Sequence, residues 1–147
     1  MHIKTLCAGL AALALAACQA ETPTSPEVSD AWARETVAGQ PMAAGYFTLT
    51  NPSDEPIRLV GVETEAANGA SLHTSLVENG VASMRPIEGG LLVEPGSYVT
   101  LEPGGDHVMF EGLKAPLVEG SEVTLTLTFE DGATLDAAVA IVGAGER

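Results

Sequence analysis

The clearest structural signal in the chain is the segment Val123-Thr124-Leu125-Thr126-Leu127-Thr128-Phe129, in which apolar and hydroxyl side chains alternate. Successive side chains of a β-strand point to opposite faces of a sheet, so this pattern indicates a strand with one buried and one solvated face. Asp131-Gly132 follows as a turn signal, and Leu135 to Val142 resumes an apolar pattern. The segment therefore predicts two strands joined by a tight turn.

Similar short segments, separated by Gly- and Pro-containing turns, continue toward the N-terminus. Asn79-Gly80 lies between two of them and is a strong hairpin signal. No segment has a convincing helical period over three turns. Strands this short and evenly spaced predict an all-β sandwich or barrel. The expected strands are 30–34, 44–50, 57–62, 71–77, 81–85, 91–93, 98–101 and 107–111.

The first eighteen residues are typical of an export signal rather than of a folded domain. Met1 to Lys4 is a short basic start, and Thr5 to Ala14 is an uncharged run too short to span a bilayer. Leu15-Ala16-Ala17-Cys18 matches the lipobox of bacterial lipoproteins, in which the cysteine is acylated and becomes the new N-terminus. An ordinary signal peptide with a chance cysteine is the alternative. Gln19 in place of Asp favours the outer membrane where a cell has two membranes.

After this signal, 1–18, we expect a flexible Pro-containing tether at 19–28 and one β-domain at 29–143. The formal net charge is −14, with twenty Asp and Glu against six Lys and Arg. Nucleic acid is an improbable partner, because phosphate binding requires a basic surface. Both cysteines, Cys7 and Cys18, precede the tether, so the domain has no disulfide, no cysteine nucleophile and no thiolate metal ligand.

Four side chains that bind soft metal ions lie within a short part of the chain: His73, Met84, His107 and Met109. Imidazole and thioether are uncharged donors, and a thioether suits Cu(I). Only Val108 separates His107 from Met109, so strand alternation puts these two on one face. Taken alone, each of the four is more commonly a packed or hydrogen-bonded residue than a ligand.

The hairpin at 78–80 brings the other two candidates together. A turn at Asn79-Gly80 sets residue 75 opposite Met84, whereas a turn at Glu78-Asn79 sets His73 opposite it. Both registers place His73 and Met84 on one face, although a three-residue loop would not. Two such pairs could make a His2Met2 site. We assign Met42, which follows Pro41, to packing.

Enzymatic chemistry has little support. A blue-copper site needs a thiolate, and a three-histidine site needs more histidines than the domain has. Ser71, Ser75 and Ser83 are not surrounded by any nucleophile motif. We therefore expect no catalytic residues.

The chain resembles the periplasmic copper chaperones of the PCu(A)C family over roughly Val28 to Val142. Their signature is a His, a Met about ten residues later, and a more distant His-x-Met. Here ten residues separate His73 from Met84, and twenty-two separate Met84 from His107, one more than in the commonest form. Ser75 stands where many relatives have another Met. Further similar segments are 28–34, Asn79-Gly80-Val81, Met84-Arg85-Pro86, Glu88-Gly89-Gly90-Leu91, Pro95-Gly96, Pro103-Gly104-Gly105, Gly112-Leu113 and 124–129.

The resemblance implies a cupredoxin-like Greek-key β-sandwich or barrel with an exposed Cu(I) site formed by His73, Met84, His107 and Met109. It also implies a periplasmic metallochaperone that delivers copper toward the dinuclear copper centre of cytochrome c oxidase. The expected partners are the oxidase subunit II or a Sco-type thiol protein, and the membrane through a lipid on Cys18. The alternative is a structural or inhibitor-type lipoprotein without a metal, in which the same His and Met residues are merely packed.

Overall fold

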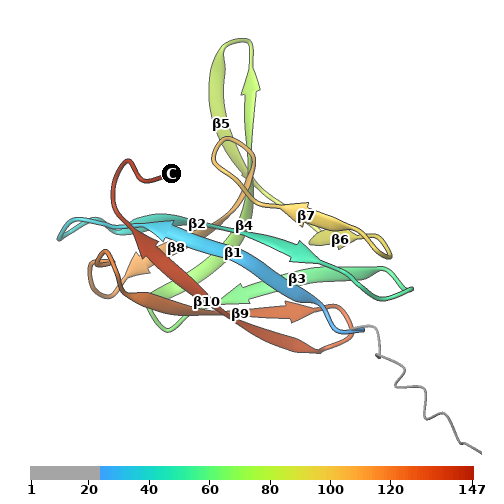
Figure 1. Ribbon diagram of the computed structural model, residues 1–147. Helices are drawn as coiled ribbons and strands as arrows, with labels where there is room; N and C mark the ends of the chain where they lie inside the picture. The colour runs from blue at the N-terminus through green and yellow to red at the C-terminus, as the bar shows by residue number, and fades with distance from the viewer. Residues whose placement is uncertain (1–23) are drawn as a thin grey trace, which may run out of the picture.

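The computed structural model describes residues 24–147, and all its regular structure is β-strand (Figure 1). Every segment expected to be a strand is one, so the all-β prediction is confirmed. The predicted signal 1–18 with its Cys18, and the tether up to residue 23, lie outside the described residues. The strands are β1 (Glu27–Arg34), β2 (Met42–Thr50), β3 (Ile57–Glu63), β4 (Ala67–Glu78), β5 (Val81–Pro86), β6 (Leu91–Val93), β7 (Tyr98–Thr100), β8 (Asp106–Leu113), β9 (Glu122–Phe129) and β10 (Thr134–Val142).

The strands form one sheet in the order β5-β4-β8-β2-β1-β10-β9-β3-β6, and β7 pairs with β2 beside this path. β1 and β10 run parallel, whereas the other recorded pairs are antiparallel. The sheet curves at the adjacent strands β1 and β10, so that β9 and β3 face β2 and β8 across the interior (Figure 1). Between residues 24 and 147 there is no helix with the length and hydrophobicity required to cross a bilayer.

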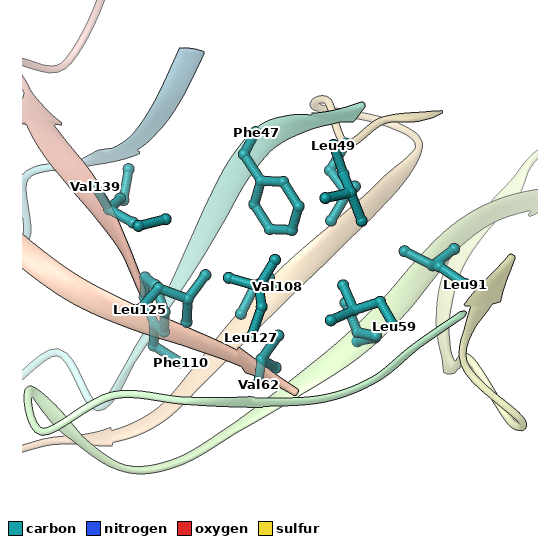
Figure 2. Packing of buried hydrophobic residues seen from close by; sticks show 14 of the residues in the cluster. Phe47, Leu49, Leu59, Val62, Leu91, Val108, Phe110, Leu125, Leu127 and Val139 are labelled. Carbon is teal, nitrogen blue, oxygen red and sulfur yellow. The ribbon is translucent and has the colours of Figure 1, made fainter. Parts of the chain in front are cut away.

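The core lies between these layers and follows from strand alternation. Leu125, Leu127 and Phe129 of β9 are buried, with partly exposed threonines between them. Figure 2 shows side chains of β2, β3, β8, β9 and β10 converging on the same interior. Full burial of each large apolar side chain contributes about 1.5–3 kcal/mol relative to an exposed one. Gly45 is required here, since a Cβ at this position would lie 2.9 Å from the Phe110 ring.

A buried asparagine fixes the loop after β2. The Asn51 amide donates to the carbonyl oxygens of Glu55 at 2.7 Å and Val93 at 3.0 Å. Its side-chain oxygen accepts from the Ser53 amide at 3.1 Å. A fully buried amide is stable only when it is hydrogen-bonded in this way. These bonds tie the end of β2 to the end of β6.

The hairpin between β4 and β5 has the register in which Asn79-Gly80 is the turn, one of the two considered from the sequence. Ser75 pairs with Met84 and Glu78 with Val81, which leaves Asn79-Gly80 as the two-residue turn. Both turn residues have positive φ, 53° and 79°, as a type I′ turn requires. The hairpin projects from the body of the sheet (Figure 1). It therefore carries Met84 away from the core.

Candidate metal centre

The adjacency of β4 and β8 brings the two histidines together. In the β4–β8 ladder His73 pairs directly with His107, and Ser71 pairs with Met109. The two imidazole ring centroids are 5.9 Å apart, with an angle of 41° between the ring planes. A metal–nitrogen bond is about 2 Å long, as in zinc sites, so one metal ion could bond to both rings with little movement.

The four candidate residues lie on the side of the sheet opposite the core, which we call the outer face. Val108 and Phe110 of β8 are in the core, so His107 and Met109 project to the other side. Met84 pairs with Ser75, two residues from His73 on β4, and so lies on the same face. The structure thus places all four residues where the hairpin and His-x-Met patterns predicted.

The histidine of β8 has one nitrogen engaged and one free. His107 is 3% exposed, and its Nδ1 lies 3.1 Å from the carbonyl oxygen of Gly105. A carbonyl only accepts, so Nδ1 carries the proton and donates, leaving a lone pair on Nε2. Nε2 is buried and has no hydrogen-bond partner. This is the tautomer that a metal-binding histidine adopts when its other nitrogen is held by the backbone.

His73 has the complementary arrangement. Its Nε2 lies 3.0 Å from the hydroxyl oxygen of Ser71, and its buried Nδ1 has no partner. The serine hydroxyl can donate or accept; when it accepts from Nε2, Nδ1 presents its lone pair. Within residues 24–147, these two imidazole nitrogens are the buried side-chain polar atoms that lack a hydrogen bond. Each such atom costs about 1–3 kcal/mol, so the arrangement suits a ligand that satisfies both.

The two thioethers differ in their surroundings. Met109 is 7% exposed and lies in the sheet between Ser71 of β4 and Ala44 of β2. Met84 is 58% exposed on the projecting hairpin. Three candidate ligands therefore belong to the rigid body of the sheet, and the fourth is accessible from solvent. Residues 24–147 contain no cluster of three or more His, Cys, Asp or Glu side chains that could hold a metal ion. The strand pairing places the two thioethers on the same face as the histidine pair.

An aromatic pair lies on the same face beyond β8. Trp32 pairs with Tyr46 between β1 and β2, and their ring centroids are 4.6 Å apart. The guanidinium groups of Arg34 and Arg147 each lie 5.7 Å from the Trp32 ring. Burial raises the pKa of the Tyr46 phenol, and the nearby Arg34 charge partly opposes this shift. Trp32 is buried on this face, and it is the single tryptophan of the chain, which makes it a useful fluorescent probe.

Sequence reasoning did not identify Ser71 as part of the site. Its hydroxyl orients the His73 ring, and the signal was present in the Ser-x-His spacing, which puts both side chains on one face of a strand. The packing role assigned to Met42 is not what the structure shows, because this side chain is 43% exposed. For a residue that begins a strand after a proline, the sequence does not indicate whether its side chain lies on the buried or the exposed face of the sheet.

Replacing Ser71 with Ala is expected to weaken metal binding without unfolding the domain. The change frees His73 Nε2, so the ring can rotate or take the other tautomer. Loss of such an outer partner typically lowers metal affinity by about 10–100-fold. Competition with a chromophoric Cu(I) chelator measures the affinity. Ser83→Ala is the matched control, since Ser83 pairs with Leu76 on the other face of the hairpin. Equal affinities for the two variants would remove Ser71 from the site.

A family model and two relatives match most of the β-domain. The family model described as "Putative lipoprotein LpqE-like" matches residues 27–141. A protein of Leifsonia xyli subsp. xyli named "Putative lipoprotein Lxx21020" is 36% identical over 115 residues, which is 78% of this chain and 68% of that protein. The uncharacterized protein RP573 of Rickettsia prowazekii is 30% identical over 103 residues, 68% of this chain and 57% of that one.

Solved structures with the same fold carry PCuAC domains. The solution structure of CuI-DR1885 from Deinococcus radiodurans superposes with a TM-score of 0.63 at 35% identity, covering 85% of this chain and 83% of that chain. The apo PCuAC domain from PmoF1 has a TM-score of 0.67 at 26% identity, covering 84% of this chain and 98% of that chain. The cupredoxin-like prediction is confirmed. The chain therefore belongs to the LpqE-like family, and its β-domain is of the PCuAC type.

Proposed function

We propose that the domain binds one Cu(I) ion through His73, Met84, His107 and Met109. The observation that carries this proposal is the pair of buried, unpartnered imidazole nitrogens on adjacent strands, beside two thioethers on the same face. Two imidazoles and two thioethers form a neutral, soft donor set, which favours Cu(I) over harder ions. The copper carried by the related domain CuI-DR1885 supports the same ion here.

We further propose that the bound copper is passed to another protein. A carrier needs ligands that an acceptor can replace one at a time. Met84 is 58% exposed and lies on a projecting hairpin, so it can be displaced while the two histidines and Met109 still hold the ion. The expected acceptor is the dinuclear copper centre of cytochrome c oxidase in subunit II, or a Sco-type thiol protein that supplies it.

We place this activity on the outer side of the cytoplasmic membrane, with the protein anchored through a lipid on Cys18. The lipobox at residues 15–18 and the lipoprotein names of relatives support an exported, anchored protein. Gln19 after the cysteine favours the outer membrane where one exists. Anchoring would keep the carrier close to membrane-bound acceptors.

Copper titration of the domain, with Met84→Leu and Met109→Leu beside the wild type, tests the proposed site. The wild type is expected to bind one equivalent of Cu(I) and to bind Zn(II) more weakly. Both variants should weaken Cu(I) binding. Leu is close to Met in volume, so Met109→Leu should cost less than about 1.5 kcal/mol of stability, and Met84→Leu, being exposed, still less.

The metal-free alternative predicts the opposite pattern. In a structural or inhibitor-type lipoprotein, Met109→Leu would change only stability, and neither variant would alter a copper titration. Zn(II) binding as tight as Cu(I) binding would also contradict the carrier, because thioethers add little to a zinc site.

A further inference from the structure

The outer face carries a third thioether close to the proposed copper ligands. In the β2–β8 ladder Met42 pairs with Glu111, and Ala44 pairs with Met109. The Leu113 amide donates to the carbonyl oxygen of Pro41 at 2.9 Å, which extends the pairing beyond Met42. Met42 is therefore a diagonal neighbour of Met109 on an ordered strand. Such neighbours have Cα atoms about 7–8 Å apart, within reach of two long side chains.

Nothing in the core accounts for Met42. Its side chain is 43% exposed, although neighbouring Ala43 on the other face is in the core. Its neighbours on β2, β8 and β4 on the outer face include small residues and one acidic residue. Ala44 follows on β2, and Gly69 lies opposite Glu111 on β4. A thioether in this position remains free to bind a soft ion.

The carboxylate of Glu111 supplies negative charge to the same part of the face. Its Oε2 lies 3.7 Å from the position that a Cβ on Gly69 would occupy, so in this structure the carboxylate leans over β4. The side chain is exposed and pairs across the β2–β8 ladder with Met42, so rotation about its side-chain bonds brings the carboxylate to the β2 side as well. Arg34 of β1 is directed elsewhere, because its guanidinium lies over the Trp32 ring and donates to the carbonyl of Arg147. Glu111 is therefore available to attract a cation.

We propose that Met42 and Glu111 form a second, weaker Cu(I) position beside Met109, through which the ion reaches or leaves the His2Met2 site. The identity of the ion rests on the proposed function. The thioether supplies a soft donor and the carboxylate supplies charge. Because Met109 is diagonal to Met42, it can bond to the ion before Met42 releases it. The step is a ligand exchange without a change of oxidation state.

Methyl NMR of the domain labelled with ¹³C-methyl methionine tests this position directly. Residues 24–147 contain three methionines, Met42, Met84 and Met109, so each signal can be assigned by substitution. The first equivalent of Cu(I) should shift Met84 and Met109, and further copper should shift Met42. Glu111→Gln should raise the copper concentration needed for the Met42 shift. A Met42 signal that stays fixed through several equivalents would overturn the proposal.

A matched control separates this position from any exposed thioether. Leu92 of β6 is 42% exposed on a strand that pairs with β3 and not with β2, β4 or β8, so Leu92→Met offers a comparable side chain outside the ladders that carry the site. The methyl signal of the introduced methionine should shift only at a copper concentration several-fold higher than the Met42 signal requires. Equal copper requirements would mean nonspecific binding and would overturn the proposal. Failure of Met84 and Met109 to shift with the first equivalent would instead overturn the proposed function.

The exchange role has a kinetic test. At matched occupancy of the first site, Met42→Leu should slow removal of Cu(I) by a chelator several-fold. The Leu92→Met variant should lose copper to the chelator at the wild-type rate. An unchanged rate for Met42→Leu would exclude Met42 from the path of the ion.

Discussion

His107→Phe is expected to abolish Cu(I) binding while leaving the domain folded. The substitution removes the buried Nε2 lone pair, a direct ligand, so the loss of affinity should exceed the roughly 10–100-fold typical of an outer partner. Phe keeps a planar ring in the site. It also removes a buried unsatisfied nitrogen that costs the free domain about 1–3 kcal/mol, which offsets an overpacking cost of similar size. The carbonyl of Gly105 keeps one partner, because it also accepts from the Ser75 amide at 3.1 Å.

Two measurements on the same samples check this result. Chelator competition gives the Cu(I) affinity, and thermal melting followed by circular dichroism gives the stability. Copper at about 100 times its dissociation constant should stabilise the wild type by about 2.7 kcal/mol and leave the Phe variant unchanged. His73→Phe should behave in the same way, since its Nδ1 is the other unpartnered nitrogen. Wild-type copper affinity in either variant would exclude that histidine as a ligand.

The metal-free stability of these variants also distinguishes the two readings of the histidines. If the imidazoles served packing alone, each would use both nitrogens in hydrogen bonds, and the Phe variants would be strongly destabilised. A buried nitrogen that serves metal binding has no hydrogen bond in the metal-free protein, which lowers the stability of that form until the metal binds. A Phe variant that is stable without copper would therefore show that the histidine it replaces serves metal binding and not packing.

Much of the fold could be predicted because the strand signals are local. Alternation identified β9 and β10, and Asn79-Gly80 fixed the hairpin to two registers, one of which the structure has. The order of strands in the sheet could not be predicted in the same way. β1 pairs with β10 although the two strands lie near opposite ends of the sequence, and no local pattern encodes such a contact.

The site was predictable only in part for the same reason. Alternation placed His107 with Met109, and the hairpin placed His73 with Met84. That the two pairs meet depends on β4 lying beside β8, with β5, β6 and β7 between them in sequence. The unequal exposure of Met84 and Met109 depends on packing. The tautomer of His107 depends on the Gly105 carbonyl, and the orientation of the His73 ring depends on Ser71. A residue pattern contains neither.

Cys18→Ser is expected to release the protein from the membrane fraction almost completely, with copper binding by the domain unchanged. Acyl chains contribute about 0.8 kcal/mol per buried methylene, and two or more chains give a stable anchor. The predicted mature chain offers little to replace them, because its excess of Asp and Glu gives it no attraction for an anionic membrane surface. The proposed ligands begin at His73, far along the chain from Cys18. Fractionation of cells that express each form, followed by Cu(I) titration of each β-domain, measures both effects. A Ser variant that stays with the membranes would contradict the lipid anchor, whereas one that is released but cannot bind copper would make Cys18 a ligand and contradict the thiol-free site.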